Sequence, residues 1–302
     1  MSTTIDDTPA PPLATLVAET IAPPAGIRAL ASELLRSPVT VAGLVVIVVL
    51  LIIAIAGPSL APQDPLAQSF LHRGAPPSAA HWLGTDRYGR DTFSRVLIGT
   101  RWSLALGLGA PLIAGVIGTM VGAVSGFFGG WTDRITSRVT DMLMAFPALL
   151  LGIMIAAALG PGFGNLVGAV SVAFVPRFIR VARAATLTVR REPYIEASFA
   201  AGQHPLRIVL KHVLPNISGP IVVVGTLWIA TAIRIEATLS FIGLGVQAPA
   251  PSWGNIVRDG LTDLLGSPWP VISAGAILTL CVLAFNIVGD AVRDVLDPEY
   301  RE

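Results

Sequence analysis

Cysteine, lysine and charged residues in general are scarce in this chain. The 302 residues include one cysteine, Cys281, so the chain by itself can form neither a disulfide framework nor a cysteine-rich metal site. Only 13% of the residues are charged and the net charge is +1, without a basic block, which argues against nucleic acid as a partner. Hydrophobic residues make up 53% and the mean hydropathy is +0.72, so an integral membrane protein is predicted.

Motifs for catalysis are missing as well. Lys211 is the single lysine, and no glycine-rich loop ends in Gly-Lys-Ser/Thr, so the chain cannot cradle the phosphates of ATP in a Walker-type site. The Gly-x-Ser-x-Gly motif of serine hydrolases is absent, and the four histidines lie in predicted loops or at the end of a span. We therefore expect a protein that is not an enzyme and that binds no cofactor or metal of its own.

Six apolar stretches are long enough to cross a hydrocarbon core about 30 Å thick, which takes roughly 20 helical residues. They predict an all-α, polytopic membrane protein with six transmembrane helices. The stretches are 39–60, 103–128, 142–160, 165–188, 215–242 and 269–292. The first, third and fourth are almost bare of ionisable residues at mid-membrane, which argues against the rival interpretation of a standalone channel or ion-coupled carrier.

The segments outside these spans divide the chain further. Residues 1–38 are rich in Ala, Pro and Thr and are predicted to be a largely flexible N-terminal segment, followed by the first span at 39–60 and a loop at 61–102. The sequence at 54–56 resembles a signal-peptidase site, but the leader is too long for a signal peptide, so we favour a retained span. Residues 103–294 form a predicted five-helix core, and 295–302 a short tail.

Arginine is concentrated in the connections that we expect to face the cytoplasm. These connections follow the second, fourth and sixth spans. The arginines in them, or at the end of the fourth span in the case of Arg180 and Arg183, are Arg134, Arg138, Arg180, Arg183, Arg190, Arg191, Arg207, Arg293 and Arg301. The pattern predicts that both termini are cytoplasmic and that the loop 61–102 is extracytoplasmic. Five arginines in that loop are a counter-signal, which three aspartates partly offset.

A polar stretch, YIEASFAAGQHPLRIVLKHVLPN at 194–216, interrupts the apolar sequence between spans four and five. Pro193 suits the first turn of a helix and Gly202 suits a left-handed C-cap, so a helix of about ten residues is predicted, with 206–213 as a second short helical segment. A helix this short is not stable alone in water. It either lies on its own bundle or docks onto a separate soluble protein. The small residues on one side of the helix would let the surface of such a protein approach closely.

The order Glu196-Ala197-Ser198, Gly202 and Leu214-Pro215 resembles the signature of bacterial ABC importer permeases. In that family the segment at 192–213 is the coupling helix, which sits in a groove of the ATPase subunit. The resemblance implies an ATPase-coupling role for Glu196, Ala197, Ser198, Gly202, His212, Leu214 and Pro215. Two positions depart from the commonest pattern: Ser198 replaces an alanine, and His212 replaces an isoleucine. A metal role for His212 is disfavoured because no second ligand lies at helical spacing.

Further stretches are similar to the second permease subunit of dipeptide, oligopeptide and nickel importers, which carries an extra N-terminal span and a long outer loop. They lie at His81–Asp86, Gly89–Asp91, Glu236–Ala237, Leu239–Gly245, Ser252–Gly254, Asn286–Asp290 and Leu296–Pro298, and the resemblance covers about residues 34–298. It implies a type I ABC importer permease fold in the bacterial inner membrane.

The same resemblance implies a set of partners and substrates. The partners are a second homologous permease subunit, two cytoplasmic ATPase subunits that use ATP and Mg²⁺, an extracytoplasmic substrate-binding protein and the lipid bilayer. The expected substrates are peptides of the dipeptide and oligopeptide class, with nickel or metal chelates, glutathione and opine-like compounds as alternatives. Nothing in the residues of the chain itself names the substrate.

Span five carries two charges, Arg234 and Glu236, which point to different faces of the helix because they lie two residues apart. The resemblance places Glu236 at a position that is often acidic, so Glu236, Ser240 and Phe241 are candidates for an outer gate or the pore. The alternatives are that Glu236 is a structural partner of other residues, or that it lies at the membrane interface and reaches water. The segment 84–91 has turn-forming residues and opposite charges, which predict an ordered loop at the outer mouth, against the second permease subunit or an incoming binding protein.

Overall fold

The computed structural model describes residues 34–296, and these residues form helices joined by loops, with no β-strand among them. The predictions for residues 1–33 and 297–302 lie outside this described part of the chain. Five helices within it are long and apolar enough to cross a membrane: α3 (Pro38–Leu60), α4 (Thr92–Phe128), α7 (Phe163–Val189), α10 (Leu214–Phe241) and α12 (Trp269–Leu296). The predicted all-α polytopic fold is confirmed.

The third predicted span, 142–160, is a bent pair of helices rather than one straight helix. α5 (Gly130–Met144) and α6 (Ala148–Leu159) meet with a bend of 92°, and counting the pair as one span brings the total to six. The break falls at Pro147, which has no N–H to donate and whose ring disfavours a helical conformation at Phe146. α6 alone is about 18 Å long, shorter than a hydrocarbon core of about 30 Å.

α4 begins at Thr92, earlier than the expected start of span two at Ser103. The Asp91 side chain caps the helix by accepting a hydrogen bond from the Ser94 N–H at 2.8 Å. Residues 92–102 of the predicted loop are therefore helical. The irregular connection is confined to 61–91, with one 3₁₀ turn at Phe70–His72.

α4 and α7 pack closely because glycines on α4 face the backbone of α7. A Cβ atom added at Gly118 would lie 2.8 Å from the Val175 carbonyl oxygen, and one at Gly122 would lie 2.5 Å from the Ile179 carbonyl oxygen. Both distances are shorter than van der Waals contact, so only glycine fits. Small residues at such contacts let the backbones of membrane helices approach closely and gain packing energy. This packing is important because lipid provides no hydrophobic drive for helices to associate.

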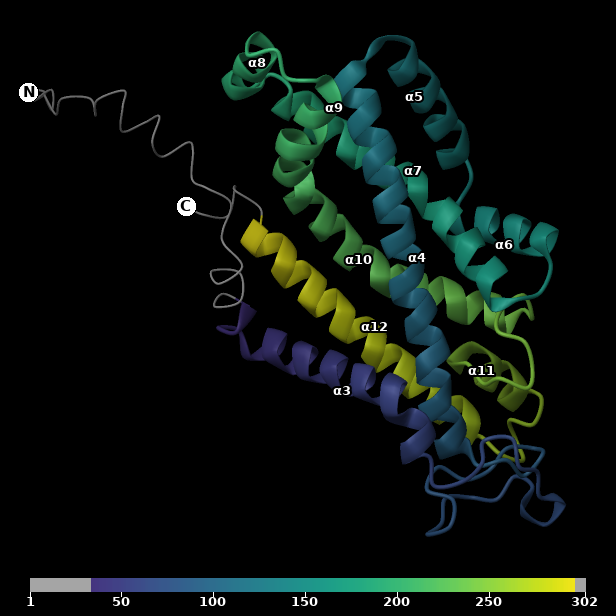
Figure 1. Cartoon of the computed structure of the whole chain (residues 1–302). Coiled ribbons are helices and arrows are strands. Elements are labelled where there is room, and N and C mark those ends of the chain that lie inside the picture. The colour runs from purple at the N-terminus through teal and green to yellow at the C-terminus, as the bar shows by residue number, and fades with distance from the viewer. Residues whose placement is uncertain (1–33, 297–302) are drawn as a thin grey trace, which may run out of the picture.

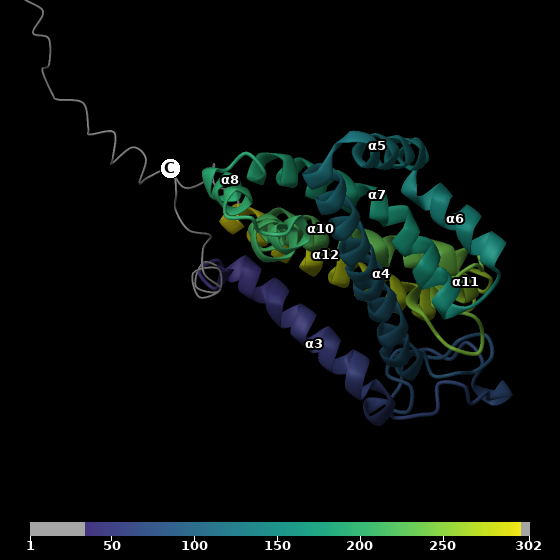
Figure 2. The same ribbon diagram turned by 45° about the horizontal axis from the view of Figure 1, so that its top comes forward.

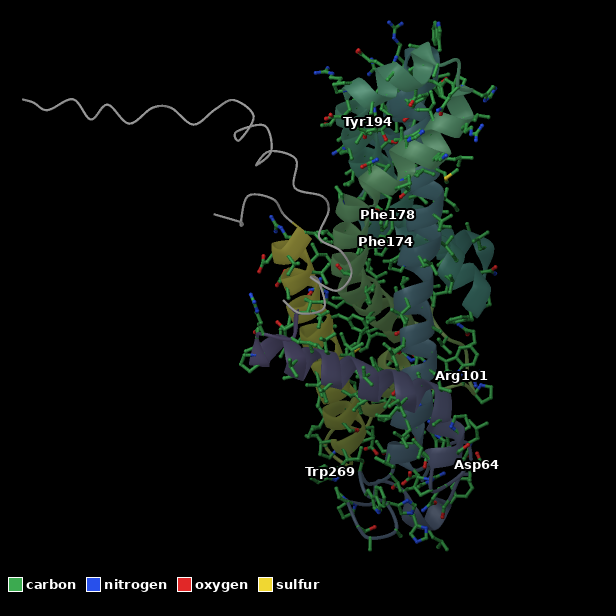
Figure 3. The ribbon with its side chains drawn as sticks, turned by 60° about the vertical axis from the view of Figure 1, so that its left-hand side comes forward. Asp64, Arg101, Phe174, Phe178, Tyr194 and Trp269 are labelled. Carbon is green, nitrogen blue, oxygen red and sulfur yellow. The ribbon has the colours of Figure 1, made fainter. Side chains whose placement is uncertain are left out.

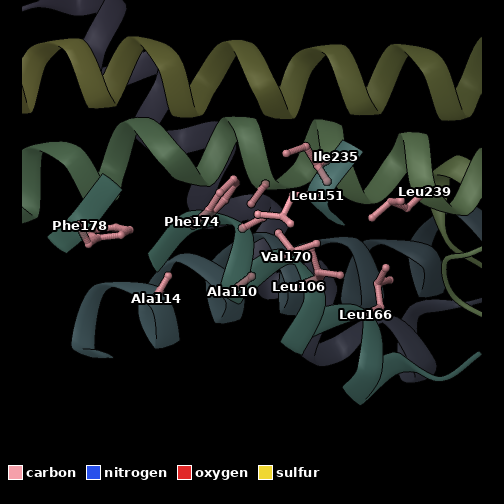
Figure 4. Packing of buried hydrophobic residues seen from close by; sticks show 12 residues of the cluster. Leu106, Ala110, Ala114, Leu151, Leu166, Val170, Phe174, Phe178, Ile235 and Leu239 are labelled. Carbon is pink, nitrogen blue, oxygen red and sulfur yellow. The ribbon is translucent and has the colours of Figure 1, made fainter. Parts of the chain in front are cut away.

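A large cluster of buried hydrophobic residues fills the space among α4, α6, α7 and α10. Figure 4 shows Phe174 and Phe178 of α7 in this cluster, with Leu106 of α4 and Ile235 of α10. α12 packs on α10, and α3 packs on α4 and α12, on the side of the bundle away from α5 and α6 (Figures 1 and 2). α3 is thus added to the side of the core, which agrees with its prediction as an extra first span.

The polar segments gather at two opposite ends of the long helices. Figure 3 shows Tyr194, on the short helix α8 (Pro193–Ala200), at one end and Asp64 and Trp269 at the other. The loop 61–91 and the helix α11 (Trp253–Leu261) lie at the end opposite α8 (Figure 1). The two polar regions with predicted partner contacts are therefore on opposite sides of the apolar bundle.

A buried ion network joins the loop 61–91 to α4 and α11. Arg90 contacts Asp86 at 2.6 Å and Asp259 at 3.5 Å, and Arg95 contacts the same two carboxylates at 3.6 and 3.8 Å. The Thr85 carbonyl also accepts a hydrogen bond from the Ser267 hydroxyl at 2.8 Å. These contacts confirm the prediction that 84–91 is an ordered loop.

Candidate functional site

The short helix α8 lies where the polar stretch between spans four and five predicted one. It begins at Pro193 and ends at Ala200, slightly shorter than the ten residues expected. Gly202 follows with a φ angle of 75°, and its N–H donates to the Phe199 carbonyl at 2.9 Å. A Cβ atom at Gly202 would meet nothing within 4 Å, so glycine is needed there for its backbone conformation and not for space.

One face of α8 is anchored on the protein's own helices. Ile195 is fully buried in a cluster with residues of α4, α7 and the chain that leads into α10: Ala123, Phe127, Ala182, Ile208, Val209, Val213 and Ile217. Ser198 is also buried, and its hydroxyl donates to the Tyr194 carbonyl at 2.8 Å, which satisfies the hydroxyl inside the helix. A short helix that is marginal in water is thus held by tertiary packing.

The opposite face of α8 is exposed. Tyr194 and Phe199 retain 41% and 45% of their accessible surface, and Glu196 and Ala197 are exposed on the same helix. The Phe199 ring also stacks on the ring of Phe127 at the end of α4. The structure therefore shows one side of this segment lying on its own bundle, while the other side is exposed apart from the Phe199 contact.

The charges at the start of α8 favour the helix and leave an acidic group on its surface. Glu196 lies in the first turn, where the helix dipole stabilises a carboxylate. Partial burial raises the pKa of the Tyr194 phenol, and the charge of Glu192 adds a smaller effect in the same direction, so Tyr194 is uncharged at neutral pH. The exposed face thus offers two aromatic rings and a carboxylate.

The sequence predicted a second short helical segment, 206–213, separate from span five. The structure shows that it is not separate. α9 (Pro205–Ile208) continues into a π-helical stretch, η2 (Val209–Val213), and then into α10 without a break. The Leu214 N–H donates to the Val209 carbonyl, five residues back. This wider turn accommodates Pro215, which has no N–H and would clash with the preceding turn of a regular α-helix. Leu214 and Pro215 therefore lie within a continuous helix.

His212 lies in η2 and is partly buried. Its Nε2 atom is buried without a hydrogen-bond partner in the described residues, while its carbonyl accepts a hydrogen bond from the Asn216 side chain at 2.6 Å. No group of three metal-ligating side chains occurs within residues 34–296, so nothing there supports a metal at His212. The residues with a predicted coupling role thus divide into a group on α8 and its cap, 196–202, and a group before and at the start of α10, 212–215.

The anchoring cluster connects α8 directly to three long helices. Ala123 and Phe127 belong to α4, Ala182 belongs to α7, and Ile217 belongs to α10. Since packed interiors deform little, a displacement of α8 would be carried to all three helices. The arrangement can therefore transmit a mechanical change from the exposed face of α8 into the membrane bundle.

Glu236, a candidate for an outer gate or the pore, lies in the interior of the subunit. It is fully buried, so the alternative that it reaches water at the interface is wrong. Its Oε2 accepts a hydrogen bond from the Ser103 hydroxyl of α4 at 2.8 Å, and its Oε1 accepts one from the Ser240 hydroxyl at 2.6 Å. Phe241, by contrast, is 40% exposed at the end of α10. Arg234 points away from Glu236 and bonds Thr231, as expected from their spacing.

Arg177 is a charged residue that was not among the predicted site residues, because span four was taken to be almost bare of charge. It lies in the interior of α7, and its guanidinium carbon is 4.4 Å from the centre of the Trp228 ring of α10. The signal that identifies it is its position, since an ionisable residue inside a membrane span is costly and is therefore a functional candidate by default.

Solved structures provide the first comparison, and it concerns the fold alone. The chain is similar to a chain of the MetNI methionine ABC transporter in an inward-facing conformation, with a TM-score of 0.54 and 22% sequence identity. The match covers 68% of this chain and 98% of the transporter chain. The fold is that of a type I ABC importer permease.

Sequence comparisons then give the family. Residues 118–302 match binding-protein-dependent transport system inner membrane components, and residues 29–77 match the N-terminal transmembrane domain of oligopeptide transport permease C. The chain belongs to the family of binding-protein-dependent transport system inner membrane components, which are subunits of ABC importers.

Curated relatives match over most of their length. The probable D,D-dipeptide transport system permease protein DdpC of Escherichia coli (strain K12) is 42% identical over 87% of this chain and 88% of its own. The dipeptide transport system permease protein DppC of Alkalihalophilus pseudofirmus is 39% identical over 89% and 88%. The glutathione transport system permease protein GsiD of Escherichia coli O1:K1 / APEC is 40% identical over 84% of each chain.

Proposed function

We propose that this chain is one of two permease subunits in an ATP-driven, binding-protein-dependent importer, and that the importer carries small peptides inward across the bacterial inner membrane. The observation that carries the proposal is α8, a short helix with one face anchored to α4, α7 and α10 and the other face exposed. One of two separate ATPase subunits, which bind ATP and Mg²⁺, would dock on that exposed face. Closure of the ATPases would displace α8, and the anchoring cluster would move the spans.

The distribution of charge supports a cytoplasmic position for α8 and for both termini. Arginines of α5, of the end of α7 and of the connection to α8 lie at the α8 end of the bundle, as the positive-inside rule expects. The arginines of the loop 61–102 argue only weakly against this orientation, because Arg90 and Arg95 are buried against Asp86 and Asp259 and do not present free charge. The loop 61–91 would then meet the substrate-binding protein or the second permease subunit.

Small peptides are the substrate class favoured by the relatives, which include permeases named for dipeptides and D,D-dipeptides. Glutathione is the second candidate, because a glutathione permease matches with almost the same identity. Nickel or metal chelates and opine-like compounds remain lower alternatives that rest on the resemblance alone. All peptide candidates share small size and a free carboxylate.

Transport by the reconstituted complex tests the proposal. The chain, its companion permease, the two ATPases and the binding protein are assembled in liposomes, and uptake of a labelled dipeptide is measured with and without ATP, with glutathione as a competitor. We expect uptake that requires every component. Full activity of this chain alone in liposomes would instead show a channel or an ion-coupled carrier, and a complex that imports only glutathione would select the second candidate.

A further inference from the structure

Arg177 is a cation inside a membrane-spanning helix, and it has no acidic partner within residues 34–296. About 21 Å of helix separate it from Phe163 at one end of α7, and about 18 Å separate it from Val189 at the other. A charged side chain at such depth is costly unless it faces protein or a water-filled passage. Arg177 is only partly buried, so part of the residue is open to whatever lies beside this face of α7.

The next two arginines of α7 are neutralised within the chain. Arg180 contacts Asp141 at 2.9 Å, and Arg183 donates two hydrogen bonds to Asp133. Arg177 has the same charge one turn before Arg180 but no carboxylate of the described chain beside it. Aspartates of α5 therefore compensate the two arginines nearer the end of α7, whereas the inner arginine keeps its positive charge.

Trp228 of α10 orients the guanidinium of Arg177. Its ring centre lies 4.4 Å from the guanidinium carbon, and the ring is itself packed on Phe174, with centroids 5.0 Å apart. The one hydrogen bond of this guanidinium within the described residues is long, 3.5 Å from Nη1 to the Ala173 carbonyl. A guanidinium that stacks by its face keeps its in-plane N–H groups available, and these match the two oxygens of a carboxylate.

We propose that Arg177, oriented by Trp228, binds the C-terminal carboxylate of a peptide as the peptide passes through the permease. The inference rests on the proposed function of peptide import. Every linear peptide carries this group whatever its side chains, so one arginine can assist peptides of different sequence. A single ion pair in a partly hydrated position is also weak enough to release its ligand, which a passage requires.

A matched pair of peptides tests this role. The full importer, with its binding protein, is reconstituted with wild-type chain, with Arg177→Gln or with Trp228→Leu, and uptake is measured for one dipeptide sequence with a free C-terminal carboxylate and with a C-terminal amide. Binding of both peptides to the binding protein is measured separately, and rates are compared at saturation. Arg180→Gln serves as the control, since it removes a charge from the same helix at a residue that Asp141 already neutralises.

The expected result is a change in the ratio of the two uptake rates. Arg177→Gln lowers uptake of the free peptide at least about tenfold, which corresponds to about 1.4 kcal/mol, and leaves the amide near its wild-type rate. Trp228→Leu gives a smaller loss of the same kind, and Arg180→Gln keeps the wild-type ratio. An equal loss for both peptides in Arg177→Gln overturns the inference and indicates a carboxylate of another subunit or a lipid phosphate at Arg177. Failure of the wild-type complex to import either peptide refutes the proposed function itself.

Discussion

The ring of Phe199 on α8 stacks on the ring of Phe127 at the end of α4, with centroids 5.7 Å apart and planes inclined by 13°. Phe127 is 3% exposed, whereas Phe199 is 45% exposed. The pair therefore joins a residue of the helix interface to a residue that a docked partner would cover. In the proposed importer, this contact would be a direct route from the docked surface to a membrane span.

Phe199→Ala is expected to weaken coupling more than stability. The ring is half exposed, so its loss removes an aromatic pair worth about 1 kcal/mol and leaves α8 anchored by Ile195. We expect the number of peptides imported per ATP hydrolysed to fall at least about threefold, the factor for about 0.7 kcal/mol, measured in reconstituted importer. Phe128→Ala is the control, because Phe128 also contacts the Phe127 ring but belongs to α4 itself. Equal effects of the two variants would contradict a special role for the link to α8.

Gly202→Ala is expected to disturb the end of α8. The φ angle of 75° is a left-handed conformation that costs a residue with a Cβ atom roughly 1–2 kcal/mol, although no neighbouring atom blocks the added methyl group. Stimulation of ATPase activity by the binding protein should fall while the complex still assembles.

Gly219→Ala provides a matched comparison for Gly202→Ala. Gly219 also has nothing within 4 Å of a built Cβ atom, but it lies inside α10 with helical dihedral angles. Alanine there should be neutral or stabilising by up to about 1 kcal/mol. If both variants retained full stimulation, the conformation after α8 would be irrelevant to coupling.

Glu236→Ala is expected to destabilise the contact between α4 and α10. It leaves the buried hydroxyls of Ser103 and Ser240 without their carboxylate acceptor, and each unsatisfied buried group costs about 1–3 kcal/mol. Glu236→Gln keeps one acceptor oxygen and should lose less. The midpoint of thermal unfolding of the purified permease pair measures both variants. Thr238→Ala, an exposed change on the same helix, should leave the midpoint unchanged, and a loss there as large as that of Glu236→Ala would remove the argument.

Local signals in the sequence were enough to predict several elements. Long apolar runs predict α3, α7, α10 and α12 because a span needs only length and hydrophobicity. Pro193 and Gly202 define α8, since each acts through its own backbone. Pro147 carried the same kind of signal, but the surrounding apolar run outweighed it, and the bend between α5 and α6 was missed.

Features that depend on distant residues were not predictable in the same way. Glu236 is buried with a hydrogen bond from Ser103, which lies 133 residues earlier in the chain, and no spacing rule connects the two residues. The π-helical stretch before Pro215 depends on a shift of backbone hydrogen bonds, and Pro215 did not reveal it because proline equally suits the first turn of a new helix. The exposure of one face of α8 required knowledge of which residues, such as Phe127 and Ile217, cover the other face.

Asp86→Asn is expected to loosen the loop 61–91. Asp86 contacts both Arg90 and Arg95, and the three side chains are almost completely buried, so neutralising Asp86 leaves two buried cations with Asp259 alone. Breaking a buried pair costs on the order of 3 kcal/mol or more. In limited proteolysis of the assembled, solubilised complex, cleavage within 61–91 should accelerate at least about tenfold, because roughly 1.4 kcal/mol of lost local stability already raises the open population tenfold. Asp141→Asn is the control, since its pair with Arg180 is more than half exposed on both sides and such pairs contribute up to about 1 kcal/mol. If the loop is cleaved no faster in Asp86→Asn than in the wild type, then the contacts of Thr85 and Ser267, rather than the ion network, hold the loop in place.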